Sequence, residues 1–168
     1  MSKRGFEQQE FESRLKRAQR RMGAKGLDAL LLTTETEVRY FTGYLTRVWE
    51  SPTRPWFLIV PVSGKPVAPM AQTWIDDICT WSAPDLEDDG VSLLADTLTQ
   101  VVPQKGVIGI PDGHETHVRM PLADLIRVRG LVGNRRVTSD FGVIREVRMV
   151  KSAAEIEKIE TACGIAAR

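Results

Sequence analysis

Helical segments alternate with short apolar runs of strand type along the chain, and this alternation limits the fold more than any other feature. The first helical pattern covers residues 7–25, and the run at residues 27–32 reads as a buried strand. Further strands are predicted at residues 56–60, 66–70, 107–110 and 136–138, and further helices near residues 35–41, 93–101 and 122–126. We therefore predict an α/β fold, with helices on both faces of a mixed, partly parallel sheet.

The segment at residues 74–81 fits two structures. Trp74, Ile75, Ile78 and Trp81 follow helical spacing, whereas residues 78–81 would also suit the end of a strand. We expect a helix here.

Composition excludes several classes of protein. The chain has 168 residues and a formal net charge of +1, which gives no electrostatic reason to expect nucleic acid or an anionic membrane as a partner. Cys79 and Cys163 lie far apart without metal-binding or redox spacing, so we expect free thiols and a cytoplasmic protein. The N-terminus lacks the apolar core of a signal peptide, and no apolar run approaches the roughly 20 residues that cross a bilayer.

The C-terminal segment differs from the rest of the chain. Ser152 and Glu155 form a capping-box pattern, which opens a helix through Ile156 and Ile159. This helical pattern still continues at Arg168, and its apolar stripe needs a partner. We expect the sequence to be a piece of a longer protein.

Motifs that carry chemistry are scarce. His114 and His117 are three residues apart beside a turn, with Glu115 as a third candidate ligand, but exposed loop histidines are favoured over a metal site. No nucleophile elbow or phosphate-binding glycine loop is present. The acidic residues at 85–89 suit a solvated loop, and the basic residues at 119–151 suit exposed helix surfaces.

The segment from Trp49 to Trp56 stands out, because Pro52 and Pro55 stiffen a loop that contains Arg54. Arg54 offers a planar fork for a carboxylate, and Trp49 offers an aromatic face for a cation or an apolar group. The alternative is structural: the indoles cover the core and Arg54 pairs with a surface acid. From the residues alone, the structural interpretation is favoured.

Three segments match a known family in order and spacing. Residues 11–32 contain a helix, Lys-Gly-Leu-Asp-Ala and a leucine strand, and residues 37–44 read Glu-Val-Arg-Tyr-Phe-Thr-Gly-Tyr. Residues 144–156 contain Arg-x-x-Lys-Ser-x-x-Glu-Ile. The chain thus resembles the N-terminal domain of the creatinase/prolidase group of metallopeptidase-like proteins. One departure is Glu37, which stands where that group has Asn.

The resemblance implies a ribonuclease H-like fold and a two-domain subunit. Residues 1–150 would be the accessory N-terminal domain, and residues 151–168 would begin the first helix of a C-terminal pita-bread catalytic domain. In the peptidases that second domain holds a dinuclear divalent metal site, with Mn, Co or Zn as candidate ions, formed by Asp, His and Glu ligands outside this chain. We expect neither catalysis nor a cofactor from these residues alone.

The resemblance also implies a function for the whole protein, as a Xaa-Pro dipeptidase, a Xaa-Pro aminopeptidase or a creatinase-like hydrolase. The domain would contribute to a homodimer and form one wall of the neighbouring subunit's pocket for a small peptide or zwitterionic substrate. The positions that match substrate contacts are Trp49 and Arg54. Two alternatives remain: a protein-binding peptidase-like module without catalysis, and a relative that acts on small non-peptide zwitterions.

Overall fold

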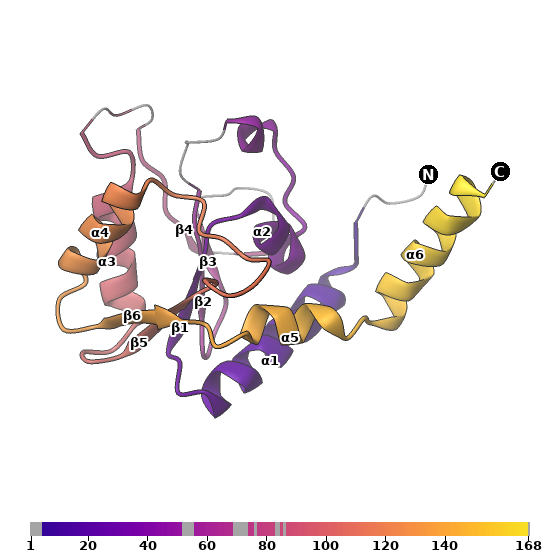
Figure 1. Ribbon diagram of the computed structural model, residues 1–168, viewed down its shortest axis with the longest axis horizontal. Helices are drawn as coiled ribbons and strands as arrows, with labels where there is room; N and C mark the ends of the chain where they lie inside the picture. The colour runs from indigo at the N-terminus through magenta and orange to yellow at the C-terminus, as the bar shows by residue number, and fades with distance from the viewer. Residues whose placement is uncertain are drawn as a thin grey trace.

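The described part of the chain forms a mixed six-stranded sheet with the strand order β4-β3-β2-β1-β5-β6 (Figure 1). The computed structural model describes residues 5–51, 56–68, 74–75, 77–82, 85 and 87–167. The strands are β1 (Ala29–Leu32), β2 (Leu58–Pro61), β3 (Val67–Ala68), β4 (Asp77–Ile78), β5 (Val107–Ile110) and β6 (Arg136–Ser139). The helices are α1 (Gln8–Ala24), α2 (Glu35–Thr42), the 3-10 helix η1 (Arg47–Glu50), α3 (Val91–Val101), α4 (Leu122–Leu131), α5 (Val143–Met149) and α6 (Ala153–Ala166).

Strand β1 lies inside the sheet, and all four of its residues are buried. It pairs antiparallel with β2 and parallel with β5, which in turn pairs parallel with β6. Strand β3 returns antiparallel to β2. The prediction of a mixed, partly parallel sheet is therefore confirmed.

Helices cover both faces of this sheet. Successive residues of β1 point to opposite faces, so each face of the strand contributes to a different core. Leu30 and Leu32 belong to a core with α1, α2 and α5. Ala29 and Leu31 belong to a second core with α3 and α4. Figure 1 shows α3 and α4 on one side of the strands and α1, α2 and α5 on the other.

Helix α1 shows how the sequence pattern fixes the packing. Its apolar residues Phe11, Leu15, Ala18 and Met22 recur at helical spacing, and each is at most 6% exposed. Burying a large apolar side chain of this kind contributes roughly 1.5–3 kcal/mol. The predicted amphipathic helix is confirmed, with its apolar stripe on the sheet.

The prediction of a helix at residues 74–81 is wrong where the structure describes the chain. Asp77 and Ile78 form strand β4, which pairs parallel with Val67 and Ala68 of β3. The N–H of Cys79 also bonds to the carbonyl of Ala68 at 3.3 Å. Short apolar runs suit either structure, and here an unpaired edge of β3 supplies partners that a helix would not use.

Helix α5 was not predicted. Its start is set by Asp140, whose carboxylate accepts hydrogen bonds at 2.9 Å from the backbone N–H groups of Gly142 and Ile144. These bonds satisfy donors that a helix N-terminus leaves free. The buried residues Val143, Ile144 and Val147 then place α5 against α1.

Helix α6 begins with the predicted capping box. The backbone N–H of Glu155 donates to the Ser152 hydroxyl at 3.1 Å, and the Glu155 carboxylate accepts from the Ser152 N–H at 2.9 Å. The helix extends away from the sheet (Figure 1), and no described residue within it is buried. Ile156 and Ile159 are 47% and 48% exposed. The apolar stripe expected from the sequence is thus uncovered in the described chain.

Candidate functional site

Three aromatic side chains form a cluster where the chain returns from α2 to the sheet. Tyr44 and Trp56 stack with their ring centroids 5.8 Å apart and their planes 10° from parallel. Trp49, from η1, meets Trp56 edge-on at 6.0 Å. All three rings are half-buried and pack against the core beneath α2. We call Tyr44, Trp49 and Trp56 the aromatic cluster.

The two ends of α2 direct the chain into this cluster. Thr34 is the N-cap and forms a capping box with Glu37, while Gly43 ends the helix in a left-handed conformation at φ 73°. A Cβ atom at Gly43 would lie 2.7 Å from the Phe11 ring. Only glycine satisfies both the backbone angle and the space here, so the turn that leads to Tyr44 depends on it.

Arg119 holds the η1 segment against the sheet. Its guanidinium carbon lies 5.0 Å from the centre of the Trp49 ring, and the guanidinium donates to the carbonyl of Ser51. Its backbone N–H donates to the Thr33 hydroxyl at 2.8 Å, directly after β1. Burial lowers the pKa of Arg119 from its ordinary value. At neutral pH an arginine still carries its charge, so the contact with Trp49 is a cation–π interaction.

Two indole N–H donors of the cluster remain unused. The Nε1 atoms of Trp49 and Trp56 are buried and find no acceptor among the residues that the structure describes. Buried polar groups are normally hydrogen-bonded, so an unsatisfied pair is unusual. Because both atoms are buried, a ligand oxygen would reach them only after the neighbouring side chains had moved.

An open groove adjoins the cluster, with a volume of about 480 Å³. The exposed ion pair between Arg47 and Glu50, with 3.1 Å between its atoms, lies on its rim. The groove is lined by Glu35, Leu45, Thr46, Arg47, Trp49 and Glu50. It gives one side of Trp49 direct access to solvent or to a partner.

The structure describes one of the two site residues predicted from the sequence, and the substrate contact predicted for each of them stays a prediction. Trp49 lies in the aromatic cluster, with the indole half-buried. Arg54 lies outside the described residues, so its role stays a prediction. Sequence reasoning missed Arg119 and Tyr44, since nothing in the local pattern links Arg119 to a tryptophan 70 positions earlier in the chain.

The histidines do not form a metal site in the described chain. His114 and His117 are both exposed in the loop after β5. Among the residues that the structure describes, no three His, Cys, Asp or Glu side chains lie close enough together to hold a metal ion.

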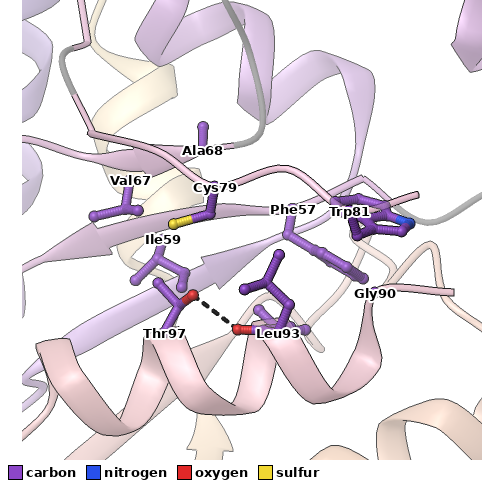
Figure 2. Close-up of a pocket in the computed structure, with 10 residues that line it drawn as sticks. Phe57, Ile59, Val67, Ala68, Cys79, Trp81, Gly90, Leu93 and Thr97 are labelled. Carbon is purple, nitrogen blue, oxygen red and sulfur yellow. Dashed lines mark hydrogen bonds between the residues drawn. The ribbon is translucent and has the colours of Figure 1, made fainter. Parts of the chain in front are cut away.

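A small apolar cavity lies on the opposite face, between β2, β3 and α3 (Figure 2). Its volume of about 20 Å³ admits little more than one water molecule. Phe57, Ile59 and Trp81 line it, and the Thr97 hydroxyl donates away from it to the Leu93 carbonyl at 2.8 Å. It is a gap in the core and offers no ligand site.

Glu37 is a buried carboxyl group in α2, only 3% exposed. Burial raises its pKa, while hydrogen bonds from Thr34 and the charges of Arg148 and His117 oppose the rise. Its carboxylate accepts from the Thr34 N–H at 3.3 Å and from the Thr34 hydroxyl. Glu37, which stands where the creatinase/prolidase group has Asn, therefore supplies the second half of the α2 capping box.

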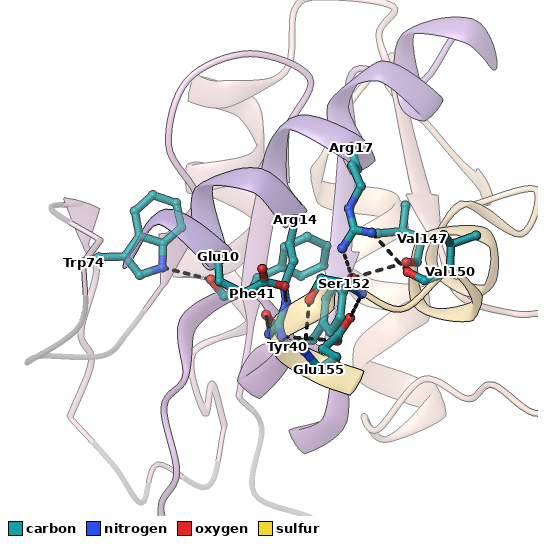
Figure 3. Close-up of polar contacts among 10 residues, drawn as sticks. All are labelled: Glu10, Arg14, Arg17, Tyr40, Phe41, Trp74, Val147, Val150, Ser152 and Glu155. Carbon is teal, nitrogen blue, oxygen red and sulfur yellow. Dashed lines mark hydrogen bonds and ion pairs between the residues drawn. The ribbon is translucent and has the colours of Figure 1, made fainter. Parts of the chain in front are cut away.

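A buried arginine joins three elements at the start of α6 (Figure 3). Arg14, 2% exposed in α1, bonds to Glu10 at 2.9 Å, to the Tyr40 carbonyl at 2.8 Å and to Glu155 at 3.1 Å. Arg17, one turn further along α1, bonds to the Tyr40 hydroxyl at 3.0 Å and to the Val150 carbonyl at 3.1 Å. These contacts fix the segment between α5 and α6 against the domain.

The comparison that decides the family covers most of the chain. A family model described as the creatinase/prolidase N-terminal domain matches residues 14–150. The chain is a creatinase/prolidase N-terminal domain. Comparison with curated protein sequences gave no match.

Solved structures of dipeptidases and prolidases resemble this creatinase/prolidase domain. A dipeptidase from Pyrococcus horikoshii OT3 is 25% identical with a TM-score of 0.68, covering 91% of this chain and 41% of that one. Dipeptidase PepE from Mycobacterium ulcerans is 24% identical with a TM-score of 0.66, covering 91% and 40%. A prolidase from Thermococcus sibiricus is 20% identical with a TM-score of 0.67, covering 88% and 39%.

The creatinase/prolidase domain described here thus spans about two fifths of the length of these solved chains. Their likeness confirms the predicted α/β fold. In the described part of the chain, every helix is too short or too polar to cross a bilayer.

Proposed function

We propose that this chain is the non-catalytic N-terminal domain of a Xaa-Pro dipeptidase, a Xaa-Pro aminopeptidase or a creatinase-like hydrolase. In this role it contributes to a homodimer and forms one wall of the substrate pocket of the neighbouring subunit. Membership of the creatinase/prolidase family and likeness to dipeptidases and prolidases support the proposal.

The observation that carries the proposal is the aromatic cluster, with Arg119 beneath Trp49. A prolyl ring is a compact apolar group that suits packing on an indole, and a substrate ammonium group suits an indole face through cation–π attraction. Trp49 borders an open groove, so one edge of the ring is available to a substrate held by another subunit.

Arg54 is the second substrate contact in this proposal. Its guanidinium would bind the substrate carboxylate through two parallel hydrogen bonds. Among the described residues on either side of Arg54, Ser51 accepts a hydrogen bond from Arg119 and Trp56 packs in the aromatic cluster. Fixed flanks reduce the entropy that the loop loses when it binds a ligand.

The proposal places the chemistry outside this chain. By family resemblance, a dinuclear divalent metal in the C-terminal domain would activate the water that attacks the substrate. Residues 1–150 would be the accessory domain and residues 151–168 the start of the catalytic one. The catalytic domain would then cover Ile156 and Ile159 of α6.

The test is hydrolysis of Gly-Pro and Ala-Pro dipeptides by the full-length protein with added manganese. We expect metal-dependent turnover, with KM raised in Trp49→Ala and in Arg54→Ala, and no turnover by the 168-residue chain alone. Phe141→Ala is the matched control, because Phe141 is a 50% exposed aromatic residue far from the cluster in sequence.

The same assay identifies the alternatives. A folded, metal-loaded protein that leaves both dipeptides intact would contradict the peptidase assignment. Turnover of a small non-peptide zwitterion would then favour the creatinase-like relative. Loss of activity in Phe141→Ala equal to that in Trp49→Ala would remove the pocket-wall role.

A further inference from the structure

A second groove is bordered by α2, the start of α6 and the segment before α1, and it shares Leu45 with the groove beside the aromatic cluster. Its volume is about 590 Å³, within the size range of small-molecule pockets. The groove is lined by Gly5, Phe6, Phe11, Arg14, Thr36, Arg39, Tyr40, Gly43, Leu45, Arg148, Lys151, Glu155 and Lys158. We call it the cationic groove, because five of these residues are Arg or Lys and one is acidic.

The acidic residue is already engaged by the floor of the groove. Glu155 accepts from Arg14 at 3.1 Å and from the N–H of Ser152 at 2.9 Å. Arg14 in turn also donates to Glu10 and to the Tyr40 carbonyl, as Figure 3 shows. This pair therefore contributes little net charge to the groove.

The walls keep their positive charge. Within the described residues, no carboxylate forms an ion pair with Arg39, Arg148, Lys151 or Lys158. Arg148 acts electrostatically on buried Glu37 without pairing with it. Four cations that gather around one concave site repel each other and create a positive potential, which an anion would relieve.

The groove also has an apolar side. The Phe6 ring lies 4.1 Å from the Arg14 guanidinium carbon and 5.1 Å from the Lys158 ammonium. Leu45, 60% exposed, lines the same space. A ligand that combines an oxyanion with an apolar or aromatic part would contact both kinds of surface.

We propose that the cationic groove binds a small organic anion, with a phosphate or carboxylate group held between Arg39 of α2 and Lys158 of α6. These two side chains come from different helices that line the groove, and both are exposed. The apolar part of the ligand packs on Phe6 and Leu45.

The experiment titrates the 168-residue chain with phenyl phosphate at low salt and follows the backbone amides by NMR. We expect saturable shifts at α2 and at the start of α6, and tighter binding of phenyl phosphate than of inorganic phosphate. Benzoate in place of phenyl phosphate tells a carboxylate ligand from a phosphate ligand. Binding should weaken as salt is added.

Two pairs of matched variants locate the site. Arg39→Gln and Lys158→Gln should each raise Kd about threefold to fivefold, as expected for loss of one charged contact near a surface. Arg129→Gln on α4 and Lys16→Gln on α1 remove exposed cations outside the groove and should leave Kd unchanged.

Either of two results would overturn the proposal: shifts that grow linearly without saturation, or equal loss of binding in the groove variants and the control variants. Circular dichroism of each variant confirms the fold, since all four side chains are exposed.

Discussion

The guanidinium of Arg14 lies 3.1 Å from the carboxylate of Glu155, although 141 positions separate them in the chain. Arg14 belongs to the first helix of the domain and is 2% exposed, while Glu155 belongs to the capping box of α6. A helix with no buried residue of its own among those described is thus joined to α1 by a charged contact at its first turn.

The first prediction concerns this contact. Glu155 uses one carboxylate oxygen for Ser152 and the other for Arg14. Gln at position 155 keeps the capping box, since Gln serves there as well as Glu, but it has only one acceptor oxygen and no charge to pair with Arg14. We expect Glu155→Gln to lower the free energy of unfolding by about 1–3 kcal/mol, measured by urea denaturation. Glu160→Gln, exposed on the same helix, should stay within about 0.5 kcal/mol of wild type. Equal effects of the two changes would contradict the role of Arg14.

The second prediction concerns Gly43. Gly43→Ala adds a Cβ that meets the Phe11 ring at 2.7 Å on top of a positive φ of 73°. Gly64→Ala is the control, because its φ is 86° and no atom lies within 4 Å of the added Cβ. Gly43→Ala should destabilise the fold by about 1–3 kcal/mol more than Gly64→Ala, measured by thermal or urea unfolding. Equal losses would mean that Phe11 moves aside freely.

The third prediction concerns Arg119. Arg119→Lys keeps the charge but loses the planar group that lies over Trp49 and bonds to Ser51. We expect a loss of about 1 kcal/mol in the free energy of unfolding and tryptophan emission shifted to longer wavelength, as Trp49 gains contact with water. Arg129→Lys on the exposed face of α4 should change neither quantity. Unchanged emission in Arg119→Lys would show that η1 is held by other contacts.

The fourth prediction concerns pH. Burial raises the folded-state pKa of Glu37 above its ordinary value of 4.5. Between pH 4.5 and the raised pKa, the folded chain therefore binds more protons than the unfolded chain. Stability from this group is present below pH 4.5 and is lost as the pH rises through the raised pKa. Glu37→Gln keeps the capping box and should remove this loss, measured as unfolding free energy across pH. A profile parallel to wild type would contradict the assignment.

Glu146 gives the opposite sign and serves as an internal comparison. A hydrogen bond from Lys25 lowers the pKa of Glu146 below 4.5. Its contribution is therefore present above pH 4.5 and is lost as the pH falls. Glu146→Gln should flatten the acid side of the stability profile, while Glu37→Gln changes the side above pH 4.5.

Most of the fold followed from the sequence because its elements are periodic. Local sequence patterns are enough to predict three of these features: the apolar stripe of α1, the leucines of β1 and the capping box at Ser152. Strand β4 did not, since two paired residues depend on the edge that β3 presents. Helix α5 is only seven residues long, and its start depends on the side chain of Asp140.

The site was less predictable than the fold. Trp49 was singled out by its loop and by family resemblance, whereas its contact with Arg119 arises only when the chain after β5 folds back over the end of β1. Contacts of this kind join residues far apart in the chain and leave no periodic trace. The cationic groove could not be predicted from the sequence either, because its residues come from α2, α5 and α6, which are far apart in the chain.

Phe6 touches both ends of the domain, with Arg14 of α1 on one side and Lys158 of α6 on the other. A force that pulls the segment before α1 away from α6 therefore acts directly on these contacts. Tension applied between the two ends of the chain would separate Phe6 from Lys158 first and would peel α6 from Arg14 next. The strands of the sheet would be pulled apart only after these contacts had broken. Helix α6 would therefore detach while the core stays folded.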